Sequence, residues 1–268
     1  MSRTARIALG FLGLLVMGVL LLPPFLPDPL QIDPGDVAAG PSPSHWLGTD
    51  ELGRDLLARL LVGARTTLAI ATLAALISSG GGALLGLWAG YQGGHFDRAV
   101  LRLLDLVSAV PRLPLMLLLA STSTGSPFLR VAVAMAAFAW ISEARIARAQ
   151  TRVVLSEDYL SAARQLGYSP LRIAMRHVLP NLSGPLSVAA TLSLGELILY
   201  ETVLSFLGLG IPPPAPSWGA MLAQGISGLS RAPLLVVAPG ALIFLTIAAI
   251  QRVGDELALA LDPRTRNR

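Results

Sequence analysis

The stretch Ser156–Pro180, SEDYLSAARQLGYSPLRIAMRHVLP, decides how we expect the chain to fold. It is a polar segment with three arginines, and long apolar segments flank it on both sides. Ser156 is typical of a helix start, because a serine hydroxyl can accept a hydrogen bond from a free backbone N–H group. The two acidic residues that follow suit the positive end of a helix dipole. Gly167 is expected to end this first helix.

A second helix is predicted from Ser169 onward. Ser169 is a capping residue, and Pro170 suits the first helical position because its missing N–H costs nothing there. Pro180 is expected to end this helix by biasing Leu179 away from helical backbone angles. The segment therefore predicts a helix, a glycine turn and a second helix.

Each of these two helices has an apolar face by three-and-four spacing. The faces consist of Tyr159, Ala163 and Leu166 in the first helix and Leu171, Met175 and Val178 in the second. Arg172 and Arg176 are four residues apart on a different face. Periodicity alone leaves two interpretations open: a helix pair resting on anionic lipid headgroups, or a docking site for a partner protein.

Composition predicts a polytopic membrane protein. The 268 residues are 53% hydrophobic and 13% charged, and the mean hydropathy is +0.65. A typical soluble domain has about a quarter of its residues charged. The net charge of +4 does not indicate nucleic acid, because the arginines are dispersed between apolar segments.

Lysine and cysteine are both absent from the sequence, and all twenty basic residues are arginine. Without lysine the chain has no G-x-x-x-x-G-K-[ST] loop for nucleotide phosphates and no Schiff-base chemistry. Without cysteine it has no disulfide, no thiolate nucleophile and no cysteine-ligated zinc. The three histidines are too scattered for a metal site, so we expect neither a metal nor a catalytic centre.

Six membrane spans are predicted from the apolar runs, and the first, with twenty uncharged residues or about 30 Å of helix, is long enough to cross a bilayer. They are Ile7–Leu26, Thr67–Tyr91, Ala99–Ala120, Phe128–Ile141, Leu182–Leu204 and Pro233–Ile250. A cleaved signal peptide is the alternative for the first span, but its apolar run exceeds the 7 to 15 residues typical of such peptides. The third span is the least regular, because it contains charged residues and two prolines.

The segment before the second span, residues 27–66, is predicted to lie outside the bilayer. Thr49 or Asp50 can cap a short helix along the membrane surface, with an apolar stripe of Leu52, Leu56, Leu60 and Leu61. In the second span, Gly80, Gly81, Gly82 and Gly86 are small residues that allow close helix packing in lipid.

Arginine placement predicts the orientation, since short cytoplasmic loops collect positive charge. With the N-terminus inside, fourteen arginines are cytoplasmic and five are outside. Both termini and the stretch Ser156–Pro180 are therefore predicted to be cytoplasmic.

The stretch resembles the EAA loop of ABC importer permeases, whose pattern is E-A-A, three residues, G, nine residues, I, one residue, L-P. Ala162, Ala163, Gly167, Leu179 and Pro180 fall on that spacing. Two positions depart from the pattern: Ser161 replaces the usual glutamate and His177 the usual isoleucine.

Further matches in the same order make the resemblance specific to the dipeptide, oligopeptide and nickel importers. They are HWLGTDELGRDLLARLLVGARTTL from His45, ETVLSFLGLGIPPPAPSWG from Glu201 and LDP at Leu261–Pro263. The chain is thus identified as a member of this permease family over nearly its whole length from His45.

The resemblance implies an all-α fold with six transmembrane helices in a bacterial inner (plasma) membrane. It divides the chain into residues 1–66, with a cytoplasmic tail, the first span and an extracytoplasmic segment, and residues 67–268, the transmembrane domain with a coupling loop at about 143–180. It implies no enzyme activity in this chain and no cofactor, since partner subunits bind ATP and Mg²⁺. The implied partners are a second, similar permease, expected as a heterodimer, two cytoplasmic ATPases, an extracytoplasmic solute-binding protein and lipid.

The resemblance assigns ATPase docking to the coupling loop. The candidate docking residues are Tyr159, Ala162, Ala163, Gly167, Leu171, Arg172, Arg176, Leu179 and Pro180. Ionisable residues within predicted spans are candidates for the translocation path, because such groups usually face other helices or water. They are Asp105, Arg112, Glu196 and Glu201.

Import of di- or oligopeptides in an alternating-access pathway is the expected function. Nickel or another small solute carried by the same family is the first alternative. An ion channel or a membrane-embedded enzyme is the alternative from a different class. A channel needs no docking loop, and an enzyme needs a nucleophile or metal constellation that the sequence lacks.

Overall fold

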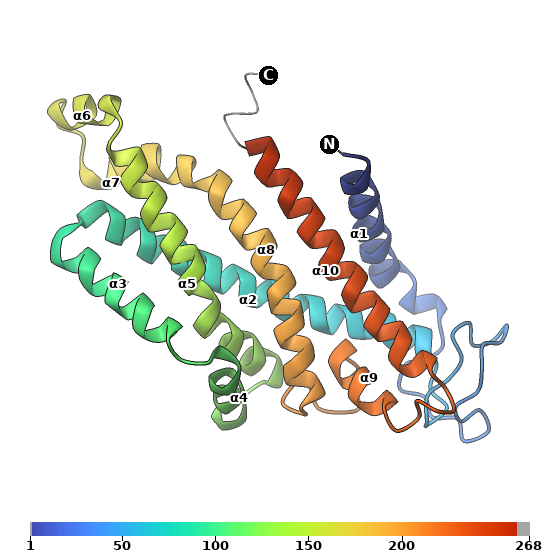
Figure 1. The fold of residues 1–268 in the computed structure, drawn as a ribbon. Coiled ribbons are helices and arrows are strands. Elements are labelled where there is room, and N and C mark those ends of the chain that lie inside the picture. The colour runs from blue at the N-terminus through green and yellow to red at the C-terminus, as the bar shows by residue number, and fades with distance from the viewer. Residues whose placement is uncertain (1, 262–268) are drawn as a thin grey trace.

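The computed structural model describes residues 2–261, except for the side chains of Ser161, Ala162 and Arg164. The end of the predicted LDP match and the last three arginines lie outside the described residues. The described chain is a bundle of tilted helices (Figure 1). The helices are α1 Arg3–Leu21, α2 Leu56–Gln92, α3 Gly94–Ser108, α4 Arg112–Thr122, α5 Pro127–Leu155, α6 Asp158–Gln165, α7 Pro170–Ile173, α8 Leu179–Phe206, α9 Trp218–Gly225 and α10 Leu234–Leu261. A 3-10 turn, η1 (Pro23–Phe25), follows α1, and a π-helical turn, η2 (Ala174–Val178), joins α7 to α8.

Five helical segments are long and apolar enough to cross a membrane: α1, α2, α5, the run from α7 through α8, and α10. The helices α3 and α4 pass the same test only as a pair, and they are bent by 87°. The predicted third span, residues 99–120, is therefore divided between two helices rather than formed by one continuous helix. The physical reason is Pro111, which precedes α4 with an extended backbone and cannot continue α3.

The two ends of the described chain lie at the same end of the bundle (Figure 1). Ser2 donates from its backbone N to Glu256 Oε1 at 2.5 Å and from its hydroxyl to Glu256 Oε2 at 2.9 Å. The elbow of α6 and α7 lies at that end too, whereas α4 and α9 lie at the other (Figure 1). With α3 and α4 counted as one broken span, the described helices provide six crossings, in agreement with the predicted total.

The helix α2 is one continuous element of 37 residues. The predicted surface helix before residue 66 is wrong, because Leu56, Leu60 and Leu61 are buried in the core and belong to the first turns of α2. The boundary placed between residues 66 and 67 falls inside this helix. Asp55 caps it, its Oδ1 accepting a hydrogen bond from Ala58 N at 2.7 Å.

The most extensive helix pairing joins α2 to α5. Gly82, Gly86 and Gly90 lie against backbone carbonyl groups of α5, where any added Cβ atom would overlap its neighbours. Gly80 and Gly81 face open space. The expectation that glycines permit close packing is thus confirmed for Gly82 and Gly86 and wrong for Gly80 and Gly81.

Candidate functional site

The elbow, defined here as residues 156–180, contains α6 and α7 and the glycine turn between them. Gly167 has φ +76°, a left-handed backbone that glycine adopts without strain, and it ends α6 as predicted. Ser169 caps α7, its hydroxyl accepting a hydrogen bond from Arg172 N at 3.3 Å. Ser156 does not cap a helix start, because its hydroxyl donates back to the Val153 carbonyl at 2.7 Å.

Pro180 does not end a helix in the structure, so this prediction is wrong. Leu179 is helical, with φ −57° and ψ −42°, and α8 continues from it. The π-helical turn η2 precedes the proline, and the Asn181 side-chain nitrogen donates to the His177 carbonyl at 2.7 Å. Such local π adjustments and side-chain hydrogen bonds let a proline stay within a membrane helix. The elbow is therefore continuous with α8.

One face of the elbow packs onto the ends of α2 and α5. Its buried apolar residues join Leu87 of α2 and Ala147 and Val154 of α5 in one cluster. They are Leu160, Ala163, Ile173, Ala174 and Val178. Burial of such side chains stabilises a fixed position of the elbow relative to these two long helices.

The opposite face leaves large apolar side chains exposed. The exposed fractions are 48% for Tyr159, 75% for Leu166, 64% for Leu171 and 55% for Met175. The predicted apolar faces are thus only partly buried, because Ala163 and Val178 pack inward and the others point outward. Contiguous exposed apolar groups are typical of interaction surfaces.

Aromatic and cationic side chains border this surface. The Tyr168 ring stacks on the His177 ring with centroids 6.3 Å apart, and the tilted Tyr159 ring has its centroid 6.0 Å from that of His177. The Arg172 guanidinium lies 5.3 Å from the Tyr168 ring centroid, within the range of a cation–π contact. Arg176 is exposed, Leu179 is half-buried and Pro180 is exposed. The side chain of Ala162, also a candidate docking residue, lies outside the described part.

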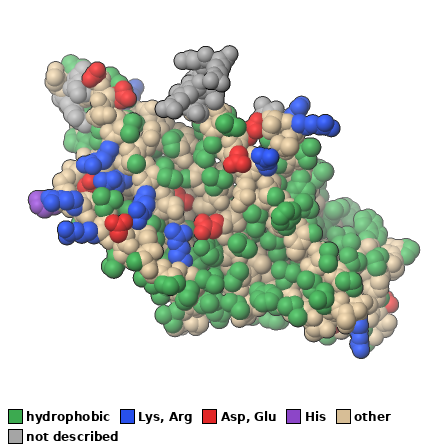
Figure 2. Space-filling view, viewed as in Figure 1, with side chains coloured by type: hydrophobic (Ala, Val, Ile, Leu, Met, Phe, Trp, Pro, Cys, Tyr) green, Lys and Arg blue, Asp and Glu red, His purple; other side chains and the backbone are tan. Residues whose placement is uncertain are grey.

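Arginine side chains gather beside the elbow, over the ends of α3 and α5 (Figure 2). Arg148 makes two hydrogen bonds to Asp97, and Arg152 approaches the same carboxylate at 3.5 Å. Hydrophobic side chains cover the middle of this view (Figure 2). The elbow thus stands at a polar, basic end of an apolar body.

The four ionisable residues predicted within spans do not form one cluster. Asp105 pairs with Arg145 at 2.8 Å, and both side chains are largely exposed. Arg112 lies 3.6 Å from Glu196, whose Oε1 also accepts a hydrogen bond from the Tyr200 hydroxyl at 2.9 Å.

Glu201 and Glu196 differ in their exposure to solvent. Glu201 is fully buried and accepts a hydrogen bond from the Ser205 hydroxyl at 2.6 Å, whereas the Glu196 side chain is 50% exposed. The two carboxylates therefore do not form a pair.

Glu143 is a buried carboxylate that lies outside the predicted spans. It is fully buried on α5, and its Oε1 accepts a hydrogen bond from the Ser193 hydroxyl of α8 at 2.9 Å. It was missed because the fourth span was expected to end at Ile141, whereas α5 continues to Leu155. The signal for this extension was the apolar helical pattern, which continues through Ala144. Ala144 is also buried.

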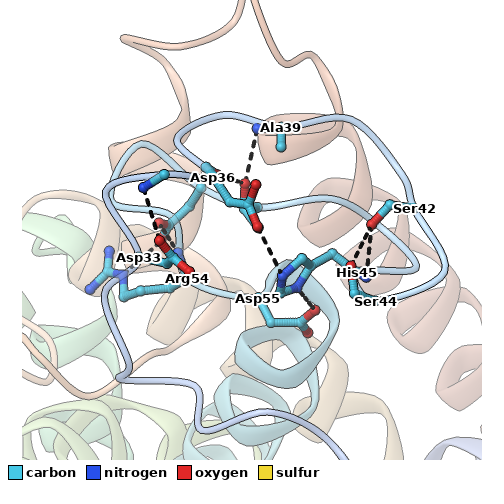
Figure 3. A network of polar contacts seen from close by, with 11 residues as sticks. Asp33, Asp36, Ala39, Ser42, Ser44, His45, Arg54 and Asp55 are labelled. Carbon is cyan, nitrogen blue, oxygen red and sulfur yellow. Dashed lines mark hydrogen bonds and ion pairs between the residues drawn. The ribbon is translucent and has the colours of Figure 1, made fainter.

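The cap, residues 28–55, lies at the other end of the bundle (Figure 1), and Figure 3 shows the polar contacts within it. His45 Nδ1 lies 2.9 Å from Asp55 Oδ2, and His45 Nε2 lies 3.7 Å from Asp36 Oδ2. The same Asp55 caps α2 with its other oxygen. The predicted extramembrane segment thus has a defined structure that is tied to the start of α2.

Comparison with known proteins agrees with this architecture. Residues 82–267 match the family described as binding-protein-dependent transport system inner membrane component. The chain belongs to this family. The match covers more than half of the chain and includes the whole elbow.

Named relatives of this permease cover most of its length. It is 39% identical to the glutathione transport system permease protein GsiD of Pectobacterium atrosepticum over 228 residues, which are 85% of this chain and 75% of the relative. It is 37% identical to the oligopeptide transport system permease protein OppC of Bacillus subtilis, over 84% and 74%. It is 42% identical to the di/tripeptide transport system permease protein DppC of Pseudomonas aeruginosa, over 82% and 73%.

A solved structure supports the fold of the permease. The MetNI methionine ABC transporter, in an inward-facing conformation, contains a chain with a TM-score of 0.54 and 20% identity to this one. The similarity covers 76% of this permease and 96% of that chain. The identification from the EAA-like spacing is confirmed: the protein is a multi-pass inner-membrane permease of an ABC importer, a transport subunit that works with separate ATPase and solute-binding partners.

Proposed function

We propose that this permease forms half of an alternating-access pathway for di- or oligopeptides, powered by ATP that partner subunits bind with Mg²⁺ and hydrolyse. Three relatives at 37% to 42% identity are named for glutathione, oligopeptide or di- and tripeptide transport, which supports a peptide substrate. Nickel or another small solute remains the alternative substrate within the same family. The second half of the pathway is a related permease, so that the pair is a heterodimer.

The elbow is the surface on which an ATPase docks. The observation that supports this proposal is the exposed apolar group of Leu166, Leu171 and Met175, opposite a face that is fixed to α2 and α5. Motion of a docked partner is passed to α8, because α7 and α8 form one run through η2. The docking residues proposed are Tyr159, Ala162, Ala163, Gly167, Leu171, Arg172, Arg176, Leu179 and Pro180.

We also propose that the elbow and both ends of the chain lie in the cytoplasm. Arginine distribution supports this side, and the shared end of the bundle supports a common side for all three parts. Asp105, Arg112 and Glu196 are proposed to line the pathway, since their side chains are exposed at 31% or more. Glu201 contributes by packing between helices rather than by contact with solute, because it is fully buried.

Gly167→Asp tests the coupling role of the elbow. The position has a left-handed backbone, and nothing lies within 4 Å of an added Cβ atom, so the substitution strains the turn without a steric clash. We expect peptide uptake to be lost while membrane insertion stays normal. Gly125→Asp is the matched control, because Gly125 has φ +109° and is equally open but lies between α4 and α5.

Co-purification gives a direct measurement of docking. The Leu171→Glu variant is expected to lose the ATPase subunits in mild detergent, because a charge replaces an exposed apolar side chain at the proposed contact. Normal uptake by Gly167→Asp, or full recovery of ATPase with Leu171→Glu, would refute the docking role.

A further inference from the structure

A cavity of about 390 Å³ lies between the cap, α9 and the start of α10. Its volume is near the lower end of the range of about 300–1,000 Å³ that small-molecule sites span. Leu52, Met221 and Leu235 contribute apolar lining, and charged side chains of the cap and the first turn of α2 contribute the polar lining. An apolar cavity with a few converging polar groups is typical of a ligand site.

Two arginines share a single carboxylate in this lining. Asp50 Oδ2 lies 2.8 Å from Arg54 Nε and 3.2 Å from Arg59 Nε. The side-chain exposures are 12% for Asp50, 10% for Arg54 and 2% for Arg59. One positive charge is therefore in excess in a place largely removed from water, where an unpaired charge is costly. Such an excess favours the binding of an anion.

The free donors of this cluster belong to Arg54. The terminal nitrogens of Arg59 already donate, one to the Pro29 carbonyl at 3.3 Å and the other to Gln224 Oε1 at 3.1 Å. Within the described residues, the terminal nitrogens of Arg54 have no hydrogen-bond partner, and Arg54 lines the cavity. Its guanidinium points away from His45 and Asp55 (Figure 3). Guanidinium groups with two free nitrogens match a carboxylate in a bidentate geometry.

Glu51 supplies a negative charge at the rim of the same cavity. Its Oε2 accepts a hydrogen bond from the Ser227 hydroxyl at 3.1 Å, in the turn between α9 and α10. In the described structure no ion pair joins Glu51 to Arg54 or Arg59, so its charge does not cancel the inner excess. The cavity thus presents a positive group inside and a negative group at the opening.

We propose that this cavity binds a small zwitterion, with its carboxylate on Arg54 and its ammonium group toward Glu51. The volume and the two separated charges fit a free amino acid or a dipeptide. This inference concerns binding to the chain itself. Its failure would therefore leave the proposed coupling and uptake unaffected.

The full chain, purified in mild detergent, is titrated with L-alanyl-L-alanine, and binding is followed by saturation-transfer NMR. We expect saturable binding that weakens at least tenfold when the probe carries a C-terminal amide. Arg54→Gln should weaken binding of the free dipeptide at least tenfold. Glu51→Gln should weaken binding of the free dipeptide but not of its N-acetyl derivative.

A cavity-filling variant tests the site independently of whether Arg54→Gln folds. Leu52 lines the cavity and is 44% exposed, so Leu52→Trp can enter the cavity without disturbing the buried cluster. Leu30→Trp is the matched control, because Leu30 is 42% exposed in the same cap and does not line the cavity. Loss of binding in Leu52→Trp with normal binding in Leu30→Trp supports the site. The proposal is overturned by absence of saturable binding to the native chain, by equal binding of the amide, or by unchanged binding in Leu52→Trp.

Discussion

Gly86→Ala should destabilise the bundle by adding a single methyl group between α2 and α5. A Cβ atom at this position would lie 2.8 Å from Ala147 Cβ and 2.9 Å from the Ala144 carbonyl carbon, and it would overlap the Ala144 oxygen. These neighbours belong to the body of α5, so relief requires α5 to move. Gly81→Ala on the same helix is the matched control, because nothing lies within 4 Å of its Cβ position.

The expected difference between the two variants is about 1–3 kcal/mol, the usual cost of adding a methylene group to a packed interior. Both substitutions gain helix propensity over glycine by up to about 1 kcal/mol, and this gain cancels in the comparison. The ratio of folded to unfolded protein should thus be about 5- to 150-fold lower for Gly86→Ala than for Gly81→Ala.

The difference in unfolding free energy is measured on protein purified in mild detergent. The protein is unfolded by heat or by adding a denaturing detergent, and the loss of helix is followed by circular dichroism. Adding Ala147→Gly to Gly86→Ala should restore part of the loss, because it removes one of the overlapping atoms and leaves the Ala144 carbonyl in place. Equal stability of Gly86→Ala and Gly81→Ala would show that α2 and α5 do not pack as described.

Four further substitutions test other contacts by the same unfolding measurements. Trp218→Phe should lower stability by about 1–3 kcal/mol, because Trp218 is fully buried and its indole nitrogen donates to a carbonyl of α2 at 3.0 Å. Arg148→Gln should lower stability by about 3 kcal/mol, because it leaves buried Asp97 with a single, more distant arginine. Arg145→Gln breaks an exposed pair and should lower stability by less than about 1 kcal/mol. Asp55→Ala should cost about 1–2 kcal/mol by removing the cap of α2. Equal costs for the two arginine variants, or no cost for Trp218→Phe or Asp55→Ala, would contradict these contacts.

The number of crossings could be predicted from the sequence because burial in lipid requires long apolar runs, and such runs are local in sequence. Helix ends were less predictable. Pro180 suggested an end, but η2 and the Asn181 side chain allow the helix to continue. Asp55 rather than Thr49 or Asp50 caps α2, because Asp50 is occupied by Arg54 and Arg59.

The elbow could be predicted as a unit, since glycine, serine and proline define its turn locally. Its division into a buried and an exposed face could not, because that depends on where α2 and α5 end in space. Leu166 shares a helical face with Ala163 in the sequence, yet Ala163 packs inward and Leu166 is 75% exposed. The cavity beside Arg54 likewise depends on α9 and α10, which are distant in sequence.

The length of α2 has a mechanical consequence. Its 37 residues correspond to about 55 Å, well beyond the roughly 30 Å of a hydrocarbon core. Its first turns carry the cap, and Leu87 near its other end packs against the elbow cluster. A stiff helix attached at one end to the cap and at the other to the elbow cluster couples these two regions mechanically, so a tilt of α2 displaces both.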